Sequence, residues 1–235
     1  MKKVMVVSGV TGGVGEELAS KFIDIGWHIV GLGRNIEKLE TLSDHHGKNF
    51  TPIRTDISDE SSVKEAFNSI KLKFRSIDIM VNNAAIFKNE QFSRCNSSDI
   101  KDIIDTNLKG SMLCTLEAIN IIKESKKAGR VINIASVAGT HGISGQAIYC
   151  ASKYGLIGFS EALNQEIIKE GISITSINPG GIDTPLWNEQ NPYPGGSKEN
   201  LLQPNDIVEA IKYIANLDPR IILKNLTIFP SNEWH

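Results

Sequence analysis

A tyrosine and a lysine four residues apart, Tyr149 and Lys153, share one side of the chain if their segment is helical. Leu156 and Phe159 continue an apolar pattern at helical spacing, which predicts a helix over residues 149–169. An ammonium group beside a phenol favours the phenolate and lowers the phenol pKa. Tyr149 can then donate a proton to a carbonyl oxygen, or accept one from an alcohol, near neutral pH. The pair alone equally fits a tyrosine packed on the core with its lysine in solvent.

A glycine-rich segment near the start of the chain, residues 8–15, has the setting of a dinucleotide-binding loop. It follows an apolar run at 4–7 that predicts a buried strand, and it precedes the helical pattern of Leu18 and Phe22. Glycines let the backbone approach a pyrophosphate, and a helix N-terminus favours its negative charge. We expect the cofactor to contact Gly9, Thr11, Gly13, Val14 and Gly15.

The end of the second predicted strand, residues 27–32, indicates which dinucleotide binds. An acidic residue there would bind the ribose 2′-hydroxyl and repel a 2′-phosphate, but Gly33 takes that place and Arg34 follows. A guanidinium is a good partner for phosphate, and Thr11 adds a hydroxyl. The sequence therefore favours NADP(H), with NAD as the alternative if Arg34 is only a solvated turn residue.

A third predicted strand, residues 50–54, leads to a candidate adenine site. Asp56 can accept a hydrogen bond from the adenine amino group, and Ile57 can pack on the ring. Asp56 can equally cap the next helix, for which Ser58 and Asp59 compete.

The remaining elements continue an alternation of strands and helices. Strands are predicted at 77–81, 131–134, 172–177 and 226–229, and helices at 61–74, 98–109, 110–127 and 205–216. The alternation predicts one α/β domain, residues 1–235, with a parallel sheet. A polar segment rich in Pro and Gly, at about 186–203, is expected to be a substrate loop.

Composition sets limits on partners and compartment. The chain has 235 residues and a formal net charge of -2, which favours neither nucleic acid nor an anionic membrane. The three cysteines show neither metal spacing nor a disulfide framework, so we expect no metal and a reducing cytoplasm. The apolar run at the N-terminus is too short for a signal peptide.

With these motifs in order, the chain resembles the short-chain dehydrogenase/reductase family, in its compact single-domain branch. Gly9, Gly13 and Gly15 match the family's TGxxxGxG loop, with Ser8 in place of its threonine. Residues 82–85, with Asn83 and Ala84 at the centre, resemble the family's NNAG segment. The Asn-Ser-Tyr-Lys tetrad is matched by Asn107, Ser136, Tyr149 and Lys153.

The resemblance implies a Rossmann fold: a doubly wound, seven-stranded parallel sheet in the order 3-2-1-4-5-6-7. It implies that Tyr149 is the general acid, that Lys153 lowers its pKa and binds the nicotinamide ribose, and that Ser136 donates to the substrate oxygen. It also implies that Asn107 holds a water. The cofactor contacts it implies include Asn83, Ala84, Tyr149, Lys153, Pro179, Gly180, Ile182 and Thr184.

The implied reaction interconverts a carbonyl compound and a secondary alcohol, with a 3-oxoacyl thioester or another ketone as the substrate. His141, Gln146 and Trp187, together with Phe87 and Tyr193, are expected near the substrate. The resemblance further implies a homodimer or homotetramer, formed through the helices at 110–127 and 149–169.

Two other functions stay open. The first is a non-catalytic NADP(H)-binding regulatory protein on the same fold, although such a protein has no need of the tetrad. The second is a sugar-nucleotide epimerase, whose loop is usually GxxGxxG and whose C-terminal region is longer than the about 50 residues after Thr184 here. The four-residue spacing of Tyr149 and Lys153 also differs from that of enoyl reductases.

Overall fold

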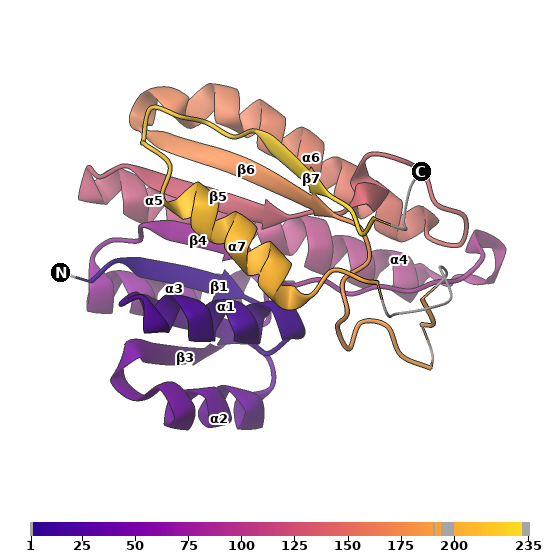
Figure 1. Ribbon diagram of the computed structural model, residues 1–235, viewed down its shortest axis with the longest axis horizontal. Coiled ribbons are helices and arrows are strands. Elements are labelled where there is room, and N and C mark those ends of the chain that lie inside the picture. The colour runs from indigo at the N-terminus through magenta and orange to yellow at the C-terminus, as the bar shows by residue number, and fades with distance from the viewer. Residues whose placement is uncertain (1, 190, 194–199, 232–235) are drawn as a thin grey trace.

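Seven parallel strands form one sheet in the order β3-β2-β1-β4-β5-β6-β7, as predicted (Figure 1). The computed structural model describes residues 2–189, 191–193 and 200–231. The strands are β1 (Val4–Ser8), β2 (His28–Gly33), β3 (Phe50–Arg54), β4 (Ile79–Asn82), β5 (Gly129–Ile134), β6 (Ile172–Pro179) and β7 (Asn225–Ile228). The central strands are buried along their whole length, which explains their continuous apolar sequences.

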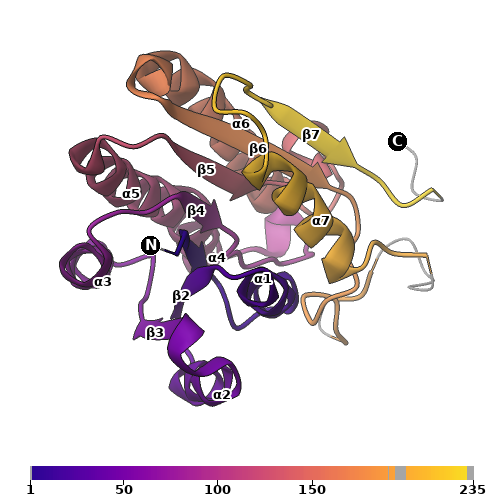
Figure 2. The ribbon, with the colours of Figure 1, turned by 60° about the vertical axis from the view of Figure 1, so that its left-hand side comes forward.

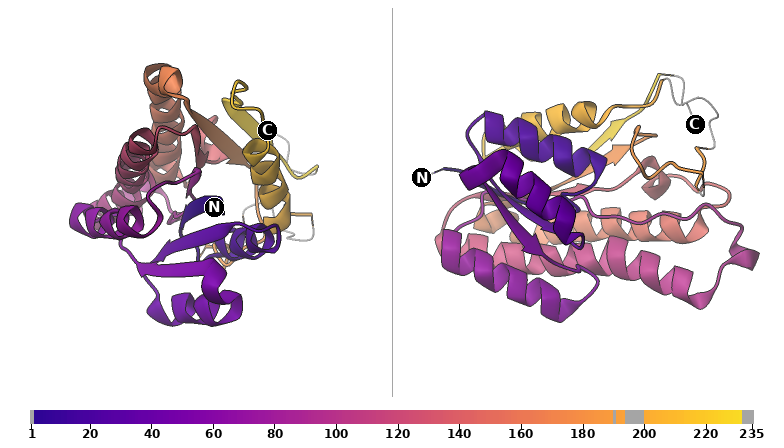
Figure 3. Two further views of the ribbon diagram at one scale, coloured as in Figure 1. Left: turned by 90° about the vertical axis from the view of Figure 1, so that its left-hand side faces the viewer. Right: turned by 90° about the horizontal axis from the view of Figure 1, so that it is seen from below.

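Helices cover both faces of the sheet (Figures 2 and 3). One face carries α1 (Gly13–Asp24), α2 (Ile36–His46) and α7 (Pro204–Ala215), whose apolar residues join one core cluster. The other face carries α3 (Glu60–Phe74), α4 (Ser97–Ile104), α5 (Ser111–Ser125) and α6 (Ala147–Ile167). Residues of α3, α5 and α6 join the second cluster. The sheet thus lies between two apolar layers, and the ends of its strands remain available to form a functional site.

The edge strands differ from the central ones in ways that suit their positions. β3 lies at one edge of the sheet, next to β2. It contains Pro52, which has no backbone N–H to donate to a neighbouring strand. β7 pairs with β6, and its residues alternate between exposed and half-buried. Both edges therefore show the sequence signs of partial exposure.

The helix α2 was missing from the predicted elements. Asn35 begins it by accepting a hydrogen bond from the Lys38 backbone N–H at 2.9 Å, and Leu39 is buried against the sheet. The remaining apolar positions of α2 are half-buried or exposed, because it covers the edge of the sheet, and its periodicity is therefore weak.

The helix predicted at 98–109 is divided. α4 ends at Ile104, and residues Asp105–Gly110 form a π-helical turn before α5 begins. Gly110 lies at the end of this turn, where a Cβ atom would come within 2.8 Å of the Ile57 carbonyl oxygen. The wider turn places Asn107 in the interior of the protein.

Candidate active site

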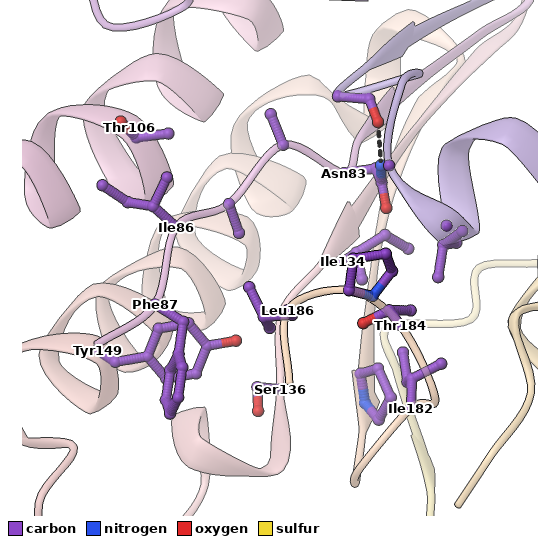
Figure 4. Close-up of a pocket in the computed structure, with 18 of the residues that line it drawn as sticks. Asn83, Ile86, Phe87, Thr106, Ile134, Ser136, Tyr149, Ile182, Thr184 and Leu186 are labelled. Carbon is purple, nitrogen blue, oxygen red and sulfur yellow. Dashed lines mark hydrogen bonds between the residues drawn. The ribbon is translucent and has the colours of Figure 1, made fainter. Parts of the chain in front are cut away.

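A cavity of about 730 Å³ runs along the carboxyl ends of the strands (Figure 4). Its lining comes from the segments that follow or end six strands, including Gly9, Gly33, Thr55, Asn83, Ile134 and Pro179. Carboxyl ends of parallel strands meet at one edge, so residues distant in sequence converge there. Nearly all the predicted cofactor residues lie on this cavity; Gly15 is the exception.

The glycine loop brings its backbone close to the segment after β4. Gly9 has φ of +65°, and a Cβ atom there would lie 2.7 Å from the Ala84 Cα. A Cβ at Gly15 would lie 2.4 Å from the Gly9 carbonyl oxygen, so Gly15 lets α1 pack against the loop without touching the cavity. A Cβ at Gly13 would lie 3.1 Å from the Thr184 methyl group. The loop is a close-packed cradle at the N-terminus of α1, which suits a pyrophosphate.

Ser8 organises the turn that faces this loop. Its hydroxyl accepts hydrogen bonds from the backbone N–H groups of Asn83 at 3.1 Å and Ala84 at 3.2 Å. The Asn83 side chain returns two bonds, to the carbonyl oxygens of Ser8 at 3.2 Å and Gly9 at 3.0 Å. The serine that replaces threonine thus retains the hydroxyl that joins the two segments.

The far end of the cavity has one exposed cation and one carboxylate. Arg34 lies on the cavity wall at the end of β2, next to Gly33 and Thr11. Asp56 also lines the cavity, where its Oδ1 accepts from the Ser58 N–H at 3.0 Å. Asp59, not Asp56, caps α3, by accepting from the N–H groups at its start. Ile57 lies beside Asp56 on the wall.

The reaction end of the cavity gathers Ser136, Tyr149 and Lys153. Figure 4 shows the Tyr149 hydroxyl pointing into the cavity, with Phe87 against its ring. The Ser136 hydroxyl lies on the cavity with that of Tyr149, and its Oγ accepts from the Ala138 N–H at 3.1 Å. Lys153 Nζ donates to the Ile134 carbonyl oxygen at 2.8 Å and lies 5.5 Å from the centre of the Tyr149 ring. The helix α6 holds the phenol and the ammonium group, and the end of β5 holds the serine.

Burial shifts the pKa values of both groups on α6. It raises the pKa of Tyr149 to about 12, against the smaller lowering effect of the Ser136 hydrogen bond. Burial also lowers the pKa of Lys153 to about 7. The prediction that Lys153 lowers the pKa of Tyr149 therefore does not describe this structure. Loss of hydration is the largest cause in both cases; it keeps Tyr149 protonated and neutral, and it leaves Lys153 about half protonated at pH 7.

Asn107 lies behind the cavity and is fully buried. Its Oδ1 accepts from the Ile86 N–H at 2.8 Å, and its Nδ2 donates to the Ile86 carbonyl oxygen at 2.9 Å and to Ser152 Oγ at 3.2 Å. The side-chain amide thus ties the segment after β4 to α6. It is not directed at the reacting groups.

The residues predicted near the substrate divide into two groups. Gln146 and Trp187 line the cavity, as do Phe87 and Tyr193. His141 does not line it, and its ring stacks on Phe229 at a centroid distance of 6.3 Å. Residues 190 and 194–199 of the predicted loop at 186–203 lie outside the described residues.

Some lining residues were not predicted. Thr106, Ile143 and Leu186 reach the cavity from the π-helical turn, the loop before α6 and the segment after β6. Their types carry no chemical signal, and their positions follow only from the fold. Within the described ranges, no group of three or more His, Cys, Asp or Glu side chains is placed to hold a metal.

Comparison with known proteins gives relatives that include dehydrogenases and reductases. Residues 3–194 match the short chain dehydrogenase family. The chain is 31% identical to farnesol dehydrogenase of Aedes aegypti over 240 residues, covering 98% of this chain and 97% of the relative. It is 34% identical to 3-oxoacyl-(acyl-carrier-protein) reductase of Salmonella typhimurium, covering 78% of this chain and 75% of the relative.

Solved structures agree in fold over the whole length. The closed form of a serine dehydrogenase complexed with NADP+ has a TM-score of 0.92 at 27% identity, covering 99% of this chain and 96% of the other. A 3-ketoacyl-(acyl-carrier-protein) reductase from Brucella melitensis, complexed with NADH, has a TM-score of 0.89 at 26% identity, covering 98% of each chain.

Proposed function

The chain belongs to the short-chain dehydrogenase family, and we propose that it reversibly reduces a ketone to a secondary alcohol with NADP(H), using Tyr149 as the general acid and base. It is an NAD(P)-dependent oxidoreductase. The observation that supports the finer proposal most strongly is the shared cavity. The Tyr149 and Ser136 hydroxyls lie on the same cavity as the glycine loop and Arg34.

The residues of the cavity fit a dinucleotide. The glycine loop leaves no room for side chains where its backbone faces Ala84 and Thr184, and it ends at the N-terminus of α1. Gly9, Thr11, Gly13 and Val14 would hold the pyrophosphate, with Gly15 packing behind them. Asp56 and Ile57 would hold the adenine, and Arg34 with Thr11 the 2′-phosphate. The nicotinamide end would meet Asn83, Ala84, Pro179, Gly180, Ile182 and Thr184. When bound, the nicotinamide supplies or accepts the hydride.

The proton chemistry belongs to the chain itself. Tyr149 remains protonated at neutral pH because its pKa is raised, so it can donate its proton to the substrate oxygen during reduction. The Ser136 hydroxyl can donate a second hydrogen bond to the same oxygen, since its own oxygen already accepts from Ala138. Lys153, with a pKa of about 7, can exchange a proton near neutral pH and lies beside the Tyr149 ring. Asn107 is a positioning residue, because it acts through Ile86 and Ser152.

Replacement of two tyrosines on the same helix tests the role of Tyr149. Tyr149→Phe should retain NADPH binding and lose ketone-dependent NADPH oxidation by at least about 100-fold, the usual size of a lost acid–base group. Tyr154→Phe is the matched control, because Tyr154 is half-exposed on α6 and does not line the cavity. Unchanged turnover in Tyr149→Phe removes Tyr149 from the mechanism. NADPH binding by the wild type without turnover of any ketone supports the regulatory alternative.

We propose further that the chain forms a homodimer or homotetramer through α5 and α6. Leu116 on α5 is about half exposed and would be covered in such an assembly. Leu116→Asp should lower the molecular mass measured by light scattering. Leu72→Asp on α3, where the leucine is even more exposed, is the control and should not change that mass.

The residues 1–235 are proposed to act as one dinucleotide-binding unit in the cytoplasm. The described residues contain no helix of the length and hydropathy required to cross a bilayer. Cys95, Cys114 and Cys150 are all unpaired thiols. Cell fractionation with an antibody to the chain tests the compartment.

A further inference from the structure

We infer that the substrate is an uncharged ketone or secondary alcohol whose reacting carbon carries a bulky hydrocarbon group. This inference rests on the proposed function, and it concerns the part of the cavity beyond Tyr149. Four aromatic rings meet there in series, and the described lining of that end carries no charged partner for a substrate.

The aromatic series begins at the catalytic ring. Phe87 meets Tyr149 edge-to-face at 5.0 Å, and Trp187 meets Phe87 edge-to-face at 5.0 Å. Tyr193 meets Trp187 in the same way at 5.2 Å. Such pairs are favourable geometries for aromatic rings and form a rigid wall. The wall extends from the reacting hydroxyl into the segment that follows β6.

Backbone contacts keep the wall in position. The Asn89 N–H donates to the Asn191 side-chain oxygen at 3.2 Å, which ties the segment of Trp187 and Tyr193 to that of Phe87. Gly181 makes room for the last ring, because a Cβ atom there would come within 2.9 Å of Tyr193. The rings are therefore held by their neighbours in the chain as well as by one another.

The other described residues that line this end are also uncharged. Ile143 and Leu186 lie on the cavity and pack with Phe87 and Trp187 in one apolar cluster. Gln146 is a neutral amide, buried on the same wall, and can accept or donate one hydrogen bond. A hydrocarbon group placed against the rings, Ile143 and Leu186 loses contact with water without burying a charged group.

Charged residues of the described lining lie elsewhere or are engaged. They are Arg34 and Asp56, which end or follow β2 and β3 at the other end of the cavity, and Lys153, which donates to Ile134. The cations that follow Phe87 in sequence are paired as well, Lys88 with Asp99 at 2.7 Å and Arg94 with Glu90 at 4.0 Å. A substrate carboxylate or ammonium would be desolvated here without a partner, which is costly. Small charged substrates such as serine are therefore disfavoured.

A matched pair of ketones tests the inference. 4-Isopropylacetophenone and 4-acetylbenzoate present the same ketone, and an isopropyl group has nearly the shape of a carboxylate. With NADPH, the wild-type protein should show a kcat/KM at least about 100-fold higher for the isopropyl compound, as expected for an unpaired buried charge. With NADP+, it should oxidise 1-(4-isopropylphenyl)ethanol in preference to serine.

Two variants connect the preference to the aromatic wall. Trp187→Lys places an ammonium group on the wall and should shift the kcat/KM ratio toward 4-acetylbenzoate by at least about 10-fold. Trp187→Leu keeps the wall apolar and should retain the wild-type preference. Tyr213→Lys is the charge-matched control, because Tyr213 is exposed on α7 and does not line the cavity. NADPH titration of each variant verifies that it is folded.

The outcomes separate this inference from the proposed function. Equal turnover of the two ketones, or preference for 4-acetylbenzoate, would overturn the inference and leave the ketone reductase activity established. Faster oxidation of serine than of 1-(4-isopropylphenyl)ethanol would overturn the inference as well, and the ketone assays would still decide the proposed function. No NADPH oxidation with either ketone or with any other carbonyl compound would overturn the proposed function, and with it the inference.

Discussion

Lys153 Nζ lies 5.5 Å from the centre of the Tyr149 ring, and both side chains are largely buried where they line the cavity. Burial raises the pKa of Tyr149 to about 12 and lowers the pKa of Lys153 to about 7. At neutral pH, Tyr149 is therefore neutral and protonated, and the Lys153 beside it is about half protonated. This arrangement prepares Tyr149 to donate a proton, and it sets the pH dependence of each direction of the reaction.

Reduction and oxidation should respond differently to pH. Reduction needs a protonated Tyr149, which the raised pKa maintains throughout the range from about pH 6 to 9, so its kcat/KM should not fall through Tyr149 ionisation there. Oxidation needs the phenolate, so its kcat/KM should rise with pH, by up to about tenfold per unit between about pH 7 and 10. Steady-state assays in both directions measure this. A decline of oxidation over that range contradicts the assignment.

The buried amino group of Lys153 should lower the unfolding free energy of the protein at neutral pH. Its folded pKa of about 7 lies below the ordinary value of 10.5, so the unfolded state binds more protons between these pH values. The unfolding free energy therefore rises with pH across that window. Lys153→Met should unfold at higher denaturant concentration than the wild type at pH 7, with a difference that shrinks toward pH 10.5, although the bond to Ile134 is lost. Lys169→Met, at an exposed position, is the control and should show no such trend.

Arg34 and Gly33 should decide between the two cofactors. Arg34→Ala should raise the Kd for NADPH about 10-fold or more and change the Kd for NADH little, because only NADPH has the 2′-phosphate. Gly33→Asp should reverse the preference, since a carboxylate there binds the ribose 2′-hydroxyl. A Cβ at Gly33 would lie 3.3 Å from the Thr11 methyl group, which can give way. Fluorescence titrations measure both constants, and an unchanged NADPH affinity in Arg34→Ala would show that Arg34 is a solvated turn residue.

Two buried asparagines each bind the backbone N–H and C=O groups of one isoleucine through the side-chain amide. Asn107 bonds to both backbone groups of Ile86, and Asn164 bonds to both backbone groups of Ile174, at 3.0 and 3.1 Å. Asn107→Leu and Asn164→Leu should each lower the unfolding free energy by about 1–3 kcal/mol, the cost of stranding buried polar groups.

Activity should distinguish these two variants. Asn107→Leu should lose most turnover per folded molecule, because Asn107 holds Ile86, which lines the cavity. Asn164→Leu should keep turnover, because the Asn164 side chain bonds to Ile174 of β6, which does not line it. Denaturation curves combined with kcat measured below the unfolding transition test this. Equal activity in both variants would make Asn107 a purely structural residue.

Much of the fold follows from local sequence patterns. Short apolar runs predicted the seven strands because buried parallel strands carry apolar side chains on both faces. The strand order came from the family resemblance. The helix α2 escaped prediction because it covers the sheet edge, where its pattern is weak, and only Asn35 and the spacing of Leu39 and Leu42 signal it.

The site was predictable to the extent that its residue types carry chemistry. Residue type and spacing are enough to identify Tyr149, Lys153 and the glycines as candidate site residues. The opposing pKa shifts depend on burial, and the π-helical turn that buries Asn107 leaves no sequence pattern that distinguishes it from an α-helix. His141 lies away from the cavity because its loop brings its ring against Phe229, and the sequence does not indicate the path of that loop.

Transfer of a labelled hydride tests the central claim most directly. The wild-type protein, given 4-isopropylacetophenone and NADPH deuterated at the transferable position of nicotinamide C4, should yield 1-(4-isopropylphenyl)ethanol with deuterium at the carbinol carbon. Tyr149→Phe should bind the same NADPH and yield almost none, while Tyr154→Phe should match the wild type. Deuterated alcohol formed at the wild-type rate by Tyr149→Phe would contradict the assignment of Tyr149 as the proton donor.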